Sequence, residues 1–148
     1  MDLDFMVVAD YVRSDNAVIS MMGAGIDTVA APVVPGVQPL GIAVRMLFDT
    51  SEPVGTAHRL TISFVSADGN RLLSAAASFQ TPPQPPGVPP HWKRAVGIAL
   101  QIPIPMPDYG DYAFELDIDD GAITKSIDFR IVRPSVPPGA SLIPPPAV

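Results

Sequence analysis

The chain contains no cysteine among its 148 residues. A disulfide-stabilised scaffold, a thiol nucleophile and a thiolate metal site are therefore excluded. Positive charge is also scarce, because nine lysines and arginines stand against fifteen aspartates and glutamates, which gives a net charge of −6. Nucleic acids and anionic membranes are bound through clustered positive side chains, so we expect neither as a partner.

Long apolar runs and targeting signals are missing as well. No stretch approaches the roughly 18 consecutive apolar residues of a membrane span. The chain opens with the acidic segment Met1-Asp2-Leu3-Asp4, whereas a secretory signal opens with a basic region. We therefore expect a cytoplasmic protein with no membrane partner.

Proline is abundant, with 19 residues, and most prolines lie in two segments. The first segment, residues 81–90, reads TPPQPPGVPP, and the second, residues 134–148, reads PSVPPGASLIPPPAV. Proline cannot donate to a β-ladder, so neither segment can form a central strand. We predict an extended, polyproline-like crossover at 81–90 and a C-terminal tail at 134–148 beyond a domain of residues 1–133.

Apolar side chains alternate with polar ones along residues 40–48, 60–64, 96–104 and 112–118. This period of two indicates β-strands with one buried face. Asp-Gly pairs that end in Gly69 and Gly121 each separate two alternating runs and predict two-residue type I′ turns. Counting back from these turns places apolar residues opposite each other in both hairpins, for example Phe114 opposite Ile127. Lys125 is the exception, and it requires a rim position or a bulge.

The first third of the chain has weaker signals. We expect a strand over residues 2–12 with one apolar face, a partner strand over 17–22, and a weaker strand over 26–34. No amphipathic helix is evident, and turns recur about every 8–12 residues. The fold class that follows is all-β, an antiparallel β-sandwich of about eight strands. The apolar face of the first strand consists of Leu3, Phe5, Val7, Ala9 and Tyr11.

One motif narrows this architecture. Residues 108–114 read DYGDYAF, which resembles the tyrosine corner of immunoglobulin-like sandwiches. The hydroxyl of Tyr112 would bond a backbone group a few residues upstream and tie this corner down. Phe114 stands where that motif has a cysteine. We therefore expect an Ig-like architecture with structural roles for Tyr112, Gly69 and Gly121.

Candidate catalytic and ligand-binding patterns are weak. His58 and His91 have no partner at metal-ligand spacing, and neither H-E-x-x-H nor G-x-S-x-G occurs. The segment Gly23-Ala24-Gly25 lacks the third glycine of a dinucleotide fingerprint and indicates a turn or bulge. We expect no enzyme activity, no cofactor and no catalytic residue. Carboxylates near residues 23–27 and 108–111 leave open a calcium- or small-ligand-binding module, although a solvated strand face explains the acidic run after residue 114.

The crossover and the tail are the candidate partner-binding segments. Trp92 beside the prolines could form an apolar ledge for a protein, or it could pack back onto the sandwich. The tail has no charged residue after Arg133 and offers an extended apolar strip. We therefore predict a non-enzymatic interaction or assembly subunit that recognises a protein partner or a second copy through the tail, the crossover or a strand edge. The candidate residues are Trp92, Pro86, Val88, Leu142, Ile143 and Pro145.

Several short segments also resemble a known family. They read LDF and ADY within residues 3–11, GAGIDT at 23–28, PGVPP at 86–90 and DYGDYAFEL at 108–116. Together they resemble a family of uncharacterised bacterial proteins, a domain of unknown function, over about residues 2–133. The resemblance implies a short, cytoplasmic, all-β protein and carries no activity, cofactor or catalytic residue.

Overall fold

The computed structural model describes residues 1–15 and 18–135, and this part of the chain is all-β. It contains no helix, and so none long and apolar enough to cross a membrane. The described residues form ten strands rather than the expected eight or so: β1 (Asp2–Ala9), β2 (Tyr11–Asp15), β3 (Val18–Met22), β4 (Thr28–Ala30), β5 (Gly36–Phe48), β6 (Ala57–Ser66), β7 (Arg71–Gln80), β8 (Arg94–Met106), β9 (Gly110–Ile118) and β10 (Ile123–Val132).

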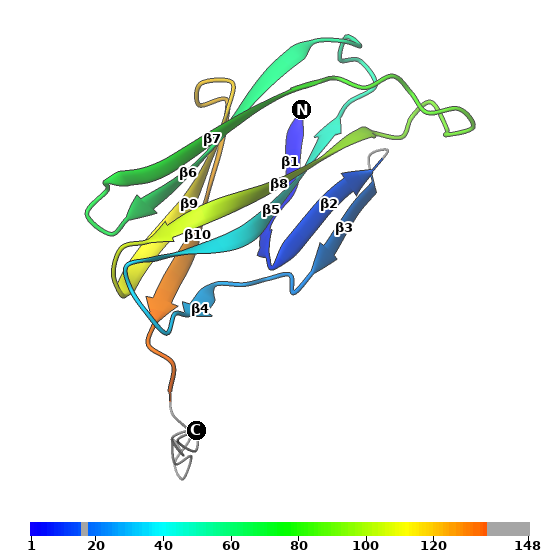
Figure 1. The fold of residues 1–148 in the computed structure, drawn as a ribbon. Helices are drawn as coiled ribbons and strands as arrows, with labels where there is room; N and C mark the ends of the chain where they lie inside the picture. The colour runs from blue at the N-terminus through cyan, green and yellow to red at the C-terminus, as the bar shows by residue number, and fades with distance from the viewer. Residues whose placement is uncertain (16–17, 136–148) are drawn as a thin grey trace, which may run out of the picture.

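The strands form two main sheets and one hairpin (Figure 1). The first sheet has the order β1-β5-β8, and the second has the order β4-β10-β9-β6-β7. The hairpin pairs β2 with β3. Both main sheets contribute to one buried cluster, so their apolar faces lie against each other.

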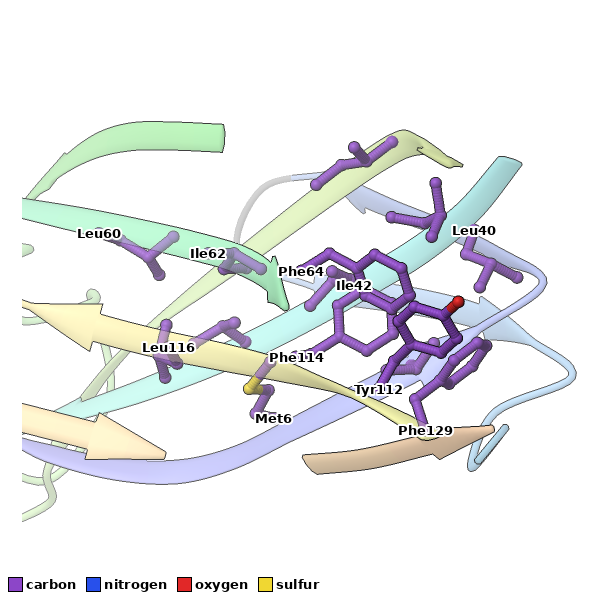
Figure 2. Close-up of a cluster of buried hydrophobic side chains, with 14 of the residues drawn as sticks. Met6, Leu40, Ile42, Leu60, Ile62, Phe64, Tyr112, Phe114, Leu116 and Phe129 are labelled. Carbon is purple, nitrogen blue, oxygen red and sulfur yellow. The ribbon is translucent and has the colours of Figure 1, made fainter. Parts of the chain in front are cut away.

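Four aromatic rings lie together in this shared core, those of Phe64, Tyr112, Phe114 and Phe129 (Figure 2). Phe64 stacks on Tyr112 with ring centroids 5.1 Å apart, and Phe114 and Phe129 meet edge to face at 5.1 Å. All four side chains are buried, and each lies on the face of its strand that the period of two predicts to point inward. Such ring pairs add to the stabilisation that burial of the apolar area provides.

The two predicted hairpins have the expected registers. Phe64 pairs with Leu73 in β6–β7, and Phe114 pairs with Ile127 in β9–β10. At the β9–β10 turn, φ is positive at Asp120 (54°) and Gly121 (96°), as the predicted type I′ turn requires, but it is also positive at the preceding Asp119 (52°), which a simple two-residue turn of this type does not need.

The β6–β7 turn differs from the prediction. Only Gly69 of its Asp-Gly pair has a positive φ, 83°, and its amide donates to the Ser66 carbonyl at 2.9 Å. This is a type I turn followed by a left-handed glycine, which is the pattern of a three-residue loop. A register shift between Phe64 and Val65 then restores the apolar facing.

The predicted strand over residues 2–12 is divided at residue 10, and its inward face was wrongly assigned. β1 pairs with β5, whereas β2 turns away and pairs with β3. Met6 and Val8 enter the main core, because a register irregularity between Leu3 and Phe5 changes the facing of the strand. Phe5 instead packs in a smaller cluster under the β2–β3 hairpin. Two further members of the expected face also differ: Ala9 lies in the smaller cluster and Tyr11 is exposed.

The β2–β3 hairpin forms a third layer on the outer face of the first sheet. Val12 is buried with Ala43, and the Ser14 hydroxyl donates to the Gly97 carbonyl at 3.0 Å. A Cβ at Gly41 would lie 2.8 Å from the Val12 amide nitrogen, so only glycine permits this approach. Small residues on the sheet therefore determine where the hairpin lies.

The weak strand expected at 26–34 contracts to β4, and β4 pairs parallel with β10 rather than antiparallel. Its pairing with β10 extends only over residues 130–132. The remainder of β10 is therefore an edge within the described residues, which explains how Lys125 can sit opposite Leu116 and stay exposed. Of the two explanations expected for Lys125, a rim position or a bulge, the structure has the rim position, since the β9–β10 register continues through Lys125 without a shift.

Candidate partner-binding site

The crossover of residues 81–93 joins β7 of one sheet to β8 of the other and extends past the strands at one end of the molecule (Figure 1). It is not a straight polyproline segment as predicted. Val88 donates its amide to the Pro85 carbonyl at 3.3 Å, and Trp92 donates to the Pro89 carbonyl at 3.0 Å. Two successive β-turns result, and each has proline at its second position, where the fixed φ of proline suits a turn.

Arg94 fixes the base of this crossover. Its side chain is buried, and its guanidinium donates to the Pro82 carbonyl at 2.9 Å and to the Asp49 and Glu52 carbonyls at 2.6 Å each. Its Nε has no hydrogen-bond partner among the described residues. The side chain thereby joins the crossover to the β5–β6 loop. Hydrogen bonds to a charged donor in a buried place are among the stronger ones.

A second attachment is made by Thr81, the first residue of the crossover. Its hydroxyl lies 3.1 Å from Nε2 of His58, and Nδ1 of the same imidazole lies 2.7 Å from the Asp119 carboxylate. The His58 ring also stacks on Phe79 at 5.2 Å. Thr81, β6 and the β9–β10 turn are thus held together by one imidazole.

The order hydroxyl, imidazole, carboxylate is that of a hydrolytic triad. Such a triad requires a substrate carbonyl to reach the hydroxyl oxygen. Thr81 is only 2% exposed, so its hydroxyl is covered in this structure. The geometry therefore supports a structural link rather than a nucleophile.

The candidate residues on the crossover are displayed to different extents. Trp92 is 57% exposed, which contradicts the alternative in which it packs back onto the sheets. Pro86 is exposed and Val88 is half-buried. The tail candidates Leu142, Ile143 and Pro145 lie outside the described residues. The Tyr112 hydroxyl donates to the Asp108 carbonyl at 2.8 Å, and Gly69 and Gly121 lie in turns with positive φ.

No pattern in the sequence identifies Arg94, His58 or Thr81 as residues that fix the crossover. A single arginine at the start of an alternating apolar strand is the one signal for Arg94, and it is weak. The contacts of His58 join residues 23 and 61 positions apart, so spacing along the chain gives no sign of them.

The acidic end loops meet a cation of the chain itself. Nε of Arg130 donates to the Asp111 carboxylate at 2.6 Å, and its backbone amide donates to the Asp27 carbonyl at 2.8 Å. Asp108 accepts the amide of Tyr109 at 2.7 Å. The guanidinium of Arg130 therefore compensates the charge of the Asp111 carboxylate. No group of three or more potential metal ligands occurs in the described part of the chain.

The segment at residues 23–25 is a turn between two strands. The Gly25 amide donates to the Val8 carbonyl at 2.9 Å, and the chain continues into β4. A dinucleotide-binding turn is followed by a helix, whose N-terminus binds the pyrophosphate. The interpretation as a turn agrees with this structure.

The sequence matches known proteins only at the level of a family, over the part of the chain that forms the strands. No curated protein and no solved structure matches the sequence. One family model, described as a family of unknown function (DUF6941), matches residues 4–132, from β1 to the last residue of β10. The match covers well over half of the chain, and the chain therefore belongs to this family of unknown function.

Proposed function

We propose that this protein is a non-enzymatic interaction module that binds a protein partner through the crossover of residues 81–93. The exposure of Trp92 carries this proposal. A large aromatic side chain on a surface is typical of the centre of a protein interface, because it buries much area on contact. Pro86 and the neighbouring prolines extend this apolar surface.

The anchoring of the crossover supports the same function. Arg94 and Thr81 hold its base, and within it the side-chain Nε2 of Gln84 donates to the Pro89 carbonyl at 3.1 Å. Because the loop is already ordered, a partner would lose little conformational entropy of this surface on binding.

We also propose that the two main sheets form an Ig-like sandwich. The Tyr112 hydroxyl donates to the Asp108 carbonyl at 2.8 Å, four residues upstream, which is the contact expected of a tyrosine corner. Ig-like sandwiches commonly display their binding residues on loops at one end, as the crossover does here.

The experiment is affinity capture with the wild-type protein and with Trp92→Ala, followed by identification of bound proteins. Val54→Ala is the matched control, because Val54 is 60% exposed on the neighbouring β5–β6 loop. A protein retained by the wild type and the control, and lost by Trp92→Ala, is then titrated in purified form. We expect an affinity loss of about tenfold or more, the range of an interface hot spot, at an unchanged melting temperature. Equal binding by all three proteins would contradict the proposal.

We propose the tail of residues 134–148 as a second docking segment. Its apolar, proline-rich composition favours extended binding. It begins at a surface hollow of about 570 Å³ lined by Val33, Tyr109, Arg133 and Pro134, among others. Truncation after Arg133 should preserve the melting temperature and reduce partner capture or assembly. Retention of both partners and assembly state would exclude this role.

A further inference from the structure

Strand β7 is an unprotected sheet edge. It is the last strand of the five-stranded sheet and pairs only with β6 among the described residues. From Leu72 to Gln80 it has no charged residue, proline or glycine. A long edge strand of this kind offers a row of free amides and carbonyls that another strand can pair with.

The other edges of the two main sheets have features that hinder such pairing. β1 carries Asp2 and Asp4, and β8 contains Pro103 and Pro105. β4 has only three residues, and the free part of β10 carries Lys125. Charges, prolines and short length are the usual means by which proteins prevent edge-to-edge association. Among the edges of the two main sheets, only β7 lacks these features along most of its length, from Leu72 to Gln80, which indicates that this edge is used.

The hydrogen-bond pattern shows which β7 groups are free. At the end of the β6–β7 ladder, the Thr81 amide donates to the Thr56 carbonyl at 2.9 Å. Hydrogen-bonded pairs recur at every second residue of an antiparallel ladder. The backbone groups of Ser74, Ala76 and Ser78 therefore point away from β6 toward the free edge.

We propose that β7 of a second copy of this chain adds antiparallel to this edge, with Ala76 on the two-fold axis. The segment Ser74-Ala75-Ala76-Ala77-Ser78 reads the same in both directions, so it is self-complementary in this register. Ser74 lies opposite Ser78 of the second copy on the exposed face, and Leu73 lies opposite its Phe79 on the core face. A two-fold interface of this type closes on itself and stops at a dimer.

Side-chain and charge effects agree with this register. The inward residues Leu73, Ala75 and Ala77 are only half-buried in one chain, so pairing would cover their remaining apolar surface. The acidic residues Glu115 and Asp117 lie on β9, and the two copies of β9 would be five strand spacings apart, about 24 Å. This exceeds the screening length of about 8 Å at physiological salt, so their repulsion is weak.

This inference rests on the proposed role in protein interaction but concerns a different element, so each can fail separately. The test is the mass of the full chain in solution by light scattering and sedimentation. The expected mass is about 31 kDa, twice the 15.6 kDa of one chain. Ala76→Pro removes an amide that points outward and leaves the β6 ladder intact, so we expect a folded monomer.

Ala76→Thr is the matched control, because it retains the amide and favours a strand, and it should remain a dimer. A second experiment uses the absence of cysteine from the chain. Paired Cα atoms in a hydrogen-bonded antiparallel pair lie about 5.5 Å apart, within the range of a disulfide. Ala76→Cys should therefore oxidise to a covalent dimer at least tenfold faster than Ser126→Cys, an exposed residue on the outer face of the same sheet.

A monomeric wild type would overturn the inference. It would do so even if the β7 edge were found to accept a strand from a different protein, because the proposed occupant is a second copy of this chain. A dimer that persists in Ala76→Pro would also overturn it, because the interface would then lie elsewhere. Loss of the dimer in Ala76→Pro, with binding at Trp92 unchanged, would support the inference independently of the proposed crossover function.

Discussion

The imidazole of His58 and the carboxylate of Asp119 lie 2.7 Å apart, although 61 positions separate them in the chain. Asp119 also accepts the Arg59 amide at 2.9 Å through its other oxygen, and its own amide donates to the Arg59 carbonyl at 3.0 Å. One aspartate thus links the β9–β10 turn to β6. Its positive φ of 52° suits aspartate, which tolerates the left-handed region better than most residues.

This link predicts a dependence of stability on acid. Burial raises the pKa of Asp119, but hydrogen bonds from His58 and from the Arg59 amide lower it more, so the pKa in the folded protein lies below its ordinary value. The carboxylate therefore binds a proton more readily in the unfolded chain than in the folded one. As a result, the free energy of unfolding decreases as the pH is lowered. The contribution of Asp119 is complete above the unfolded pKa of about 3.9 and is lost as pH falls through the lower folded pKa.

Urea unfolding between pH 6 and pH 3 measures this effect. Asp119→Asn should be less stable than the wild type at pH 6, and the difference should narrow toward pH 3. Both proteins should still lose some stability toward low pH, because a hydrogen bond from the Ser66 hydroxyl also lowers the pKa of Asp68. Parallel stability curves for the two proteins would show that Asp119 does not contribute in this way.

The tyrosine corner predicts a specific effect of one hydroxyl group. Tyr112→Phe removes the bond to the Asp108 carbonyl and leaves the ring stacked on Phe64. We expect a loss of about 1–2 kcal/mol in the free energy of unfolding, because the carbonyl loses its partner in a partly buried place. Tyr11→Phe is the control, since Tyr11 is 48% exposed, and it should have no measurable effect. An unchanged denaturant midpoint for Tyr112→Phe would remove this support for an Ig-like architecture.

The β9–β10 turn predicts a backbone effect at Gly121. Its φ is 96°, and a Cβ there would meet nothing within 4 Å, so any loss of stability comes from the backbone conformation. Gly121→Val should lose about 1–3 kcal/mol, because a β-branched residue resists positive φ. Ala122→Val places the same side chain next to it without a positive φ. If both variants melt alike, conformational strain at Gly121 is not the cause.

The parts of the fold that the sequence predicted are those in which local signals agree. In β9–β10 the Asp-Gly turn and the alternation of Phe114 and Ile127 specify one register, and the structure has it. In β6–β7 the turn differs from the predicted type, and a bulge restores the predicted pairing of Phe64 with Leu73. Burial of these two apolar side chains on the same face therefore determines the register more strongly than the turn does.

The remaining parts depend on contacts between distant segments. A bulge near Leu3 reverses which side of β1 is buried, and no local residue marks it. β4 is placed by pairing parallel with β10, which is a hundred residues later in the chain. Arg94 fixes the crossover by donating to the backbone carbonyls of Asp49 and Pro82. Every residue has a backbone carbonyl, so the sequence does not show which ones Arg94 contacts. Trp92 was identified from its sequence surroundings, and only the structure shows that it is exposed.

The close approach of Gly41 to Val12 makes a prediction about the β2–β3 hairpin. A Cβ at position 41 would lie 2.7 Å from a Val12 methyl group and 2.8 Å from the Val12 amide nitrogen. The side chain could rotate, but the backbone nitrogen can avoid the clash only if the hairpin moves. Gly41→Ala should therefore lift the hairpin and lose about 1–3 kcal/mol, as overpacked sites do.

Hydrogen exchange locates this effect. The amides of β2 and β3 should exchange faster in Gly41→Ala, whereas those of β6 and β9 should keep their protection, because the hairpin packs on a cluster separate from the main core. Val12→Ala is the control, since it removes apolar contact but leaves the backbone in place. Adding Val12→Ala to Gly41→Ala should restore only part of the protection, because the contact with the amide nitrogen persists. Full recovery in the double variant would show that the Val12 side chain, and not the backbone, requires glycine at position 41.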